Sequence, residues 1–462
     1  MKRKKILILT GVLLLLMAGV ALLVRHGAGT LPFVAEVLPA QQTVAFAALE
    51  QPDAWLRALD DALAKLPEGQ RLGRIDRVQL TTLMGFDPAD AQAWQREGVD
   101  AQRGLALTVD ARAFIGKTPQ PLVWVAGGPP HVGAAQQHWL KVDDWSMATQ
   151  SQVTPQQLQE GPKLARDPVL RAAFDGMPTG PRLALYASAD GLQQALSPPM
   201  TPKMRETLSH VTQRLRGMAL AVTPAKMRAR TVLSAEGVES LRQIFGKDVG
   251  NQHFSQHMPT QGFLALRLSF NLRELFDGVM TWIPPSMLEA RLGLASVRMG
   301  LLALTGIDWT QLERAFAGQL VVGVDLGQAG TETAAFLLLS VRDQPIADAA
   351  IGAMKTHSGQ GGMPIFVAQR LETVYVLAQS AETLARLVQA QPATHGEQVV
   401  HALDGDVVLG LAFEPPHTGA MAGLPVSALT VVHDPAGLLM NADARPLELA
   451  VMIAGWIVRR AE

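Results

Sequence analysis

The stretch Ile6 to Val24, ILILTGVLLLLMAGVALLV, is the strongest constraint in this sequence, because it is apolar throughout and carries no charge. A bilayer core of about 30 Å needs roughly 20 helical residues. The basic cluster Lys2 to Lys5 stands in front of it and favours the cytoplasmic side. The sequence therefore predicts a cytoplasmic tip and single-pass signal anchor in residues 1–26. That anchor would lie in the inner membrane, with the ectodomain in the periplasm.

The alternative is a cleaved signal peptide. Such a peptide has a shorter apolar region, of about 7–15 residues, and small residues of A-x-A type after it. Here the run is longer and is followed by Arg25 and His26, so the uncleaved anchor is favoured. The chain has no Cys, which excludes a lipid anchor on Cys, disulfides and Cys nucleophiles.

Charge is distributed unevenly. Five basic residues lie before Glu36, the first acid: Lys2, Arg3, Lys4, Lys5 and Arg25. The rest of the chain has 40 − 5 = 35 basic and 41 acidic side chains, a net charge of −6. A nucleic-acid partner needs a basic stripe for phosphate contacts, so none is expected.

After the anchor we expect a juxtamembrane linker at residues 27–40 and then two lobes. The first lobe is placed at 41–250 and the second at 251–462, joined near Lys247 to Gln261. A chain of 462 residues is long enough for two or more such lobes.

A strand followed by an amphipathic helix recurs along the chain. The strand-like runs are Thr43 to Leu49, Arg182 to Tyr186, Phe263 to Leu268 and Thr373 to Ala378. Pro52 opens the first helix, and Ser188, Ser269 and Ser380 are the expected caps of the others.

A hairpin follows each copy. The expected strand pairs are 104–109 with 122–125, 218–222 with 227–233, 319–324 with 334–341, and 428–432 with 437–441. The last three lead into a closing helix. We therefore predict an α+β fold of repeated strand–helix–hairpin modules. These would form mostly antiparallel sheets with helices packed on one face.

Three stretches together resemble a family of bacterial membrane-anchored envelope proteins, a domain of unknown function. They are Leu38-Pro39-Ala40 with the TVAFAAL that follows, Ala165 to Leu170 before RLALYASADGL, and GIDWTQLERAFAGQLVVGVDL from Gly306. The resemblance covers most of Pro39 to Val388. It implies a periplasmic or surface location and no particular activity. The chain departs from many relatives in lacking a lipoprotein Cys.

Candidate chemical groups are few. His253 and His257 are four apart, as metal ligands on a helix can be, but Phe254 stands where a zinc protease has Glu. The Gly-rich stretches after Gly127 and His357 lack the Lys of a phosphate loop. His138, Trp139, Asp143, Asp144 and Trp145 form the densest polar cluster, for which packing is the favoured interpretation. No catalytic, cofactor-binding or metal residue and no cofactor is assigned.

The region Phe276 to Leu304 is rich in Leu and Met and poor in charge. It is either an exposed apolar patch for a protein, a lipid or the membrane, or a buried helical hairpin, which is favoured. Its methionines Met280, Met287 and Met299 are expected to fill the core.

The segment Leu447 to Val458, LELAVMIAGWIV, is too short to span a bilayer. It is expected to be a helix packed on the last sheet, and the alternative is an interfacial helix with Trp456 among the headgroups.

The sequence favours a non-catalytic binding or envelope-maintenance protein, with a protein or lipid partner. The alternative is a periplasmic, hydrolase-like enzyme whose site is assembled only in the fold. A concave site with converging titratable groups would indicate the enzyme, and a broad apolar patch would indicate the binding protein.

Overall fold

The structure is a computed structural model of the chain. It describes residues 31–40, 43–64, 90–96, 104–110, 122–127, 139–142, 145–149, 162–196, 201–224, 227–245, 253–305, 307–326, 333–357, 366–389, 395–416 and 426–442. The expected anchor, residues 27–30 of the expected linker and the expected C-terminal helix lie outside these ranges. Within them, no helix is long and apolar enough to cross a membrane.

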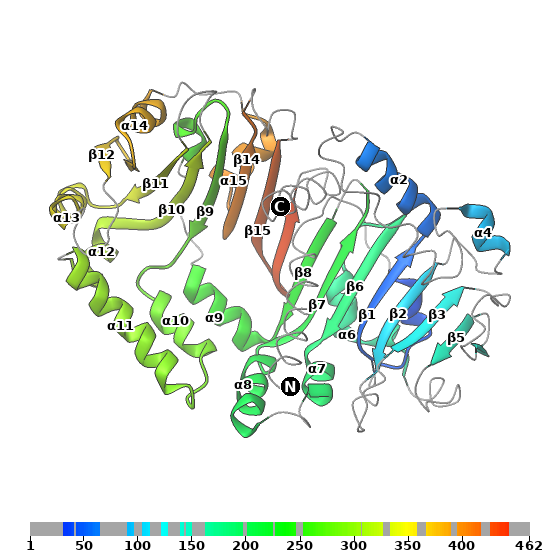
Figure 1. Cartoon of the computed structure of the whole chain (residues 1–462). Coiled ribbons are helices and arrows are strands. Elements are labelled where there is room, and N and C mark those ends of the chain that lie inside the picture. Colours follow the sequence, from blue (N-terminus) through cyan, green and yellow to red (C-terminus); the bar gives the residue numbers. More distant parts are fainter. Residues whose placement is uncertain are drawn as a thin grey trace, which may run out of the picture. The chain divides into compact units, whose positions relative to one another are not determined.

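The chain forms an α+β structure with antiparallel sheets, as predicted (Figure 1). It divides into two compact units, residues 1–234 with 441–462 and Ala235–Met440. Each unit is described by itself.

The sheet of the first unit has the strand order β8-β7-β6-β1-β2-β3-β5-β4. Neighbouring strands pair antiparallel throughout. The strands are β1 (Thr43–Glu50), β2 (Leu105–Asp110), β3 (Leu122–Gly127), β4 (Trp139–Val142), β5 (Trp145–Thr149), β6 (Arg182–Ser188), β7 (Leu215–Val222) and β8 (Met227–Leu233).

Its helices are η1 (Phe33–Glu36), α2 (Pro52–Ala64), α4 (Ala91–Arg96), η4 (Leu164–Arg166), α6 (Pro168–Phe174), α7 (Ala189–Leu196) and α8 (Pro202–Thr212). The core lies where η1, η4 and α6 cover one sheet face. There Phe174 of α6 stacks on Phe46 of β1, with ring centroids 6.2 Å apart. Asp167 starts α6 by accepting from the backbone amides of Val169 and Leu170.

A buried ion pair links the end of β1 to β6. Arg182 is fully buried and donates from Nε to Glu50, while its Nη1 donates to the carbonyl of Pro178 at 2.6 Å. Glu50 also accepts from the backbone amide of Phe33 at 2.9 Å. These bonds satisfy charges that would otherwise be costly to bury.

The second unit has the strand order β12-β13-β11-β10-β9-β14-β15-β16. Its strands are β9 (Phe263–Ser269), β10 (Phe316–Asp325), β11 (Ala334–Val341), β12 (Val367–Arg370), β13 (Val374–Ala378), β14 (Leu409–Glu414), β15 (Ser427–Asp434) and β16 (Gly437–Ala442), whose last two residues belong to the first unit.

The helices of this unit are α9 (Ala235–Phe245), η5 (Phe254–His257), α10 (Leu275–Trp282), α11 (Leu288–Thr305), α12 (Trp309–Ala315), α13 (Gln344–His357), α14 (Ala381–Val388) and α15 (Glu397–Asp404). Ser188 and Ser380 cap the helices α7 and α14, as predicted, each accepting from a backbone amide in the first turn.

Two details differ from the predictions. Ser269 is no cap: it is the last residue of β9, and its buried hydroxyl donates to the carbonyl of Val407 at 3.0 Å.

Helices cover both faces of the second sheet rather than one. Val374 and Val376 of β13 pack toward η5, α14 and α15, and the alternate residues Tyr375 and Leu377 pack toward α12 and α13.

Candidate functional site

Helix α11 carries the large apolar side chains with the highest exposed fractions in the described part of the chain. Leu288 is 62% exposed and Met299 is 68% exposed, and Leu292 and Leu302 are exposed as well. The expected buried hairpin over Phe276 to Leu304 is therefore wrong for α11, and Met299 does not fill the core. The less favoured alternative, an exposed apolar patch, is what the structure contains.

The exposed side chains form one stripe. Leu288, Leu292, Ala295, Met299 and Leu302 are separated by four, three, four and three residues, and all five are exposed. This spacing returns to the same side of a helix every two turns. We call these five residues the α11 stripe. Val297, which is 50% exposed, lies about 200° around the helix from Ala295 and is not part of it.

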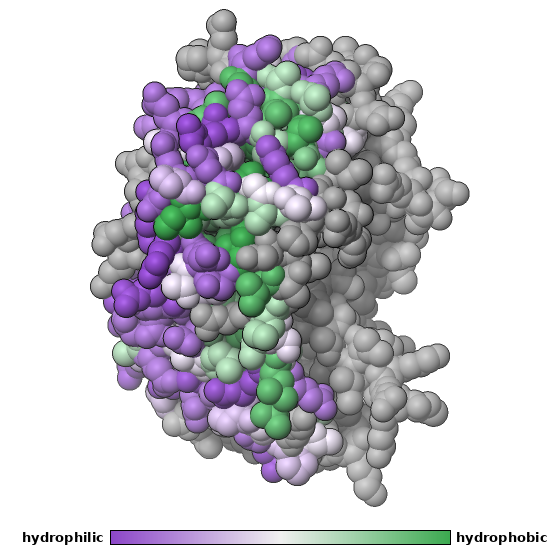
Figure 2. Space-filling view, turned by 90° about the vertical axis from the view of Figure 1, so that its left-hand side faces the viewer, coloured by the Kyte–Doolittle hydropathy of each residue, from purple (hydrophilic) through white to green (hydrophobic). Residues whose placement is uncertain are grey.

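The body of the second unit holds α11 along another side. The helix packs on α10, α12 and α13, and the Arg291 guanidinium donates to the carbonyl of Ile283 at 3.3 Å. Beneath it, Phe276 of α10 meets Trp309 of α12 edge to face at 4.5 Å, and the Trp309 indole donates to the carbonyl of Leu272. The stripe is thus presented by a fixed helix. Figure 2 shows green, hydrophobic surface in its lower half, at the height of α11 in Figure 1.

A second apolar surface lies on the sheet. On β10, Val322 is 46% exposed, and its register partner Leu266 on β9 is half-buried. Leu411 on β14 pairs with Leu266 in turn and is also half-buried. Where part of an antiparallel sheet is left open to solvent, its outward positions are ordinarily polar, so an aliphatic row at this uncovered part of the sheet is an unusual feature.

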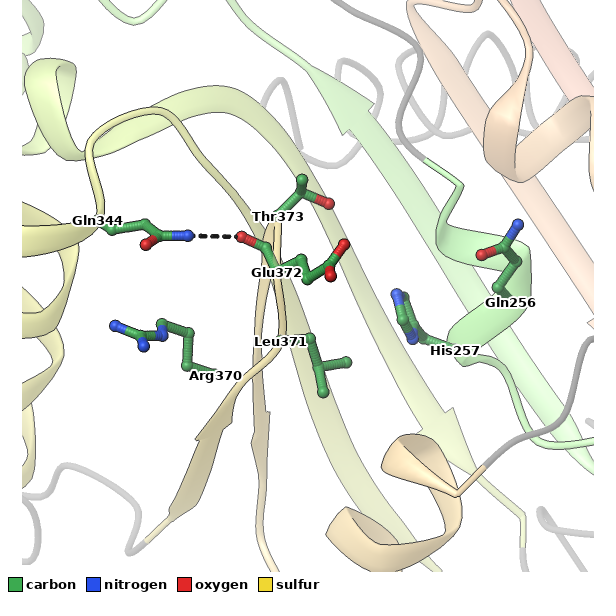
Figure 3. Close-up of a pocket in the computed structure, with 7 residues that line it drawn as sticks. All are labelled: Gln256, His257, Gln344, Arg370, Leu371, Glu372 and Thr373. Carbon is green, nitrogen blue, oxygen red and sulfur yellow. Dashed lines mark hydrogen bonds between the residues drawn. The ribbon is translucent and has the colours of Figure 1, made fainter.

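The second unit also has a polar pocket of about 610 Å³ (Figure 3). Its lining residues are Gln256, His257, Gln344, Arg370, Leu371, Glu372 and Thr373. They come from η5, the start of α13 and the turn between β12 and β13. The turn is held by Gln344, whose side-chain amide donates to the carbonyl of Glu372 at 2.8 Å.

His257 and Glu372 face each other across this pocket in Figure 3. Burial lowers the pKa of His257 below its ordinary value, and the nearby Asp404 carboxylate partly opposes this shift. His257 is therefore neutral at pH 7 and can accept or donate a proton. Arg370 is already engaged, because it donates to the Asp348 carboxylate at 2.6 Å.

The neighbouring Asp404 has a structural role. Its carboxylate accepts from the backbone amide and the hydroxyl of Ser255, which anchors η5 to the end of α15. His253 is largely exposed and lies 3.8 Å from the same carboxylate. His257 is the last residue of the four-residue helix η5, and His253 is the N-cap residue before it. No group of three metal-ligating side chains occurs within the described ranges.

The other candidate stretches lie mostly beyond the described residues. His357 is the last residue of α13 and Gly127 the last of β3, and the Gly-rich stretches after them are not described. Trp139 and Trp145 lie on β4 and β5, whereas His138, Asp143 and Asp144 fall outside the described part.

The sequence did not predict the pocket, and it predicted an exposed apolar patch over Phe276 to Leu304 only as the less favoured alternative. Gln344, Arg370 and Glu372 are far from His257 in sequence and meet only through the fold. The stripe did have a local signal, the alternation of four and three residues between its members. Comparison of the chain with protein-family models, curated proteins and solved structures finds no match.

Proposed function

We propose that this protein is a non-catalytic binding protein of the bacterial cell envelope that contacts an apolar partner through the α11 stripe. The observation that carries the proposal is the exposure of the five stripe residues on a helix fixed by its other side. Contiguous exposed apolar surface of this kind is typical of interaction sites. A helix that is apolar on both its packed and its exposed sides is suited to burial by a second body.

The proposal includes the placement of the chain. Ile6 to Val24 anchors it in the inner membrane, and the remainder lies in the periplasm. The support is the uncharged apolar run behind four basic residues, together with the resemblance to envelope proteins. The recurring order of strand, helix and hairpin is proposed to reflect one repeated module.

Affinity isolation from cells tests the binding role. The full chain carries a tag, and cells are treated with a chemical cross-linker before extraction. We expect the recovered partner to be lost in the variant Leu292→Glu with Met299→Glu, because two charges interrupt the stripe. The matched control is Val297→Glu, an exposed apolar position off the stripe, which should recover the partner as the wild type does. Equal recovery by all three proteins would contradict the role of α11.

The second candidate is a hydrolase-like enzyme at the pocket, favoured by the neutral His257 opposite Glu372. In that case His257 acts as a general base, and the Glu372 carboxylate orients the His257 ring or supplies negative charge to the pocket. The test measures turnover of chromogenic ester and glycoside substrates by the full chain. Turnover that disappears in His257→Gln and persists in His253→Gln would establish the enzyme. The binding proposal expects no difference between these variants and the wild type.

A further inference from the structure

We infer that the partner seated on the α11 stripe is a second copy of α11, so that this protein pairs with itself through these helices. The inference rests on the proposed function and names its occupant.

The spacing of the stripe fits another helix. Residues that alternate at four and three positions form the seam of a two-helix coiled coil, in which each side chain inserts between side chains of the facing helix. The α11 stripe supplies five consecutive members of such a seam, from Leu288 to Leu302. The Leu and Met side chains at these positions can pack against the same side chains of a second copy. A pair related by a twofold axis buries the same surface on both copies.

Charge disfavours a lipid surface as the occupant. Helices that lie in a membrane interface carry Lys and Arg on their polar side. The charged residues of α11 are Glu289, Arg291 and Arg298, and the Arg291 guanidinium already donates to the Ile283 carbonyl. The helix therefore lacks the row of Lys and Arg that would hold it on an anionic membrane, whereas pairing with a second α11 needs no such row.

The surface area that two copies of α11 can bury limits the affinity of the pair. A standard interface buries roughly 800 Å² on each partner. The 18 residues of α11 span about 27 Å, at about 1.5 Å per residue, and five side chains along that length supply only part of this area. The pair is therefore weak in dilute solution. Tethering both copies to one membrane raises their effective concentration and favours pairing.

The central residue of the stripe gives a direct test. Ala295 lies next to its own copy whether the two helices run parallel or antiparallel about the middle of the stripe. The chain has no native Cys, so Ala295→Cys places a single thiol there, and Val297→Cys places one on the other side of α11 as the control. Both positions are exposed, so neither change disturbs the core.

The experiment oxidises the full-length single-cysteine proteins in their native membranes. We expect Ala295→Cys to form a disulfide-linked dimer several-fold more than Val297→Cys does, and to lose it when Leu292→Glu and Met299→Glu are added. No dimer, or equal dimer at both positions, would overturn self-pairing.

A photoactivatable cross-linker attached to the thiol of Ala295→Cys separates the inference from the proposed function. A product of twice the 49.5 kDa chain supports the second copy. A product with a different protein, or with lipid alone, overturns self-pairing and leaves the binding function standing. The absence of any product overturns both.

Discussion

At the residue scale, the clearest assignments concern Ser hydroxyls at the start of helices, because few partners are within reach of such a hydroxyl. Ser188 and Ser380 could be predicted as caps because a Ser before an amphipathic run accepts from the first turn. Ser269 has the same local context, but its hydroxyl is buried toward Val407. A sequence pattern does not show which side of a strand end faces the core, so this prediction was wrong.

His257 gives a prediction for pH dependence. Because burial lowers its pKa in the folded chain, the unfolded chain binds a proton at a higher pH than the folded chain does. Its contribution to stability is therefore complete above about 6.5, the ordinary value, and is lost as the pH falls toward the folded pKa. Urea unfolding at pH 7.5 and pH 5.5 should show a smaller loss of stability for His257→Gln than for the wild type. An identical loss, with the exposed His253→Gln as control, would contradict this.

At the scale of elements, the hairpins could be predicted and the surfaces could not. The pairs β7 with β8 and β10 with β11 were expected from two apolar runs joined by turn residues, and the structure confirms both. The helix α11 was expected, but its exposure was only the less favoured of two alternatives. Apolar side chains lie on both the packed and the exposed sides of α11, so the periodicity of the sequence alone cannot show which side the body of the protein covers. The pocket depends on contacts between distant segments and has no local signature.

The start of α12 is set by a reciprocal cap. Asp308 accepts from the backbone amide of Gln311 at 2.7 Å, and the Gln311 side chain accepts from the backbone amide of Asp308 at 3.1 Å. The variant Asp308→Ala should lose about 1 kcal/mol in the free energy of unfolding, because one orphan amide is left without its acceptor. Asp308→Ser keeps an acceptor and should lose only a fraction of that. Denaturant titration measures both, and equal losses would show that the cap is not the cause.

At the scale of the whole molecule, the tail from Leu447 to Val458 is predicted to be a packed helix and lies outside the described residues. Truncation after Asp443 removes several apolar side chains, each of which stabilises the fold by about 1.5–3 kcal/mol when buried. We expect a clear fall in the melting temperature of the ectodomain. An unchanged melting temperature with weaker membrane association would instead favour the interfacial helix.

We expect the α11 stripe to be covered by its partner in the periplasm of the living cell, and thiol labelling measures this. Met299→Cys and Val297→Cys each place one thiol on α11 in a chain without native Cys. Both are exposed in the isolated chain, so a water-soluble maleimide should label both in dilute purified protein.

In cells whose outer membrane admits the reagent and whose inner membrane does not, we expect labelling at position 297 and protection at position 299. Equal labelling of the two positions would show that nothing covers the stripe. Labelling of neither position until the cells are lysed would show that the chain is not in the periplasm.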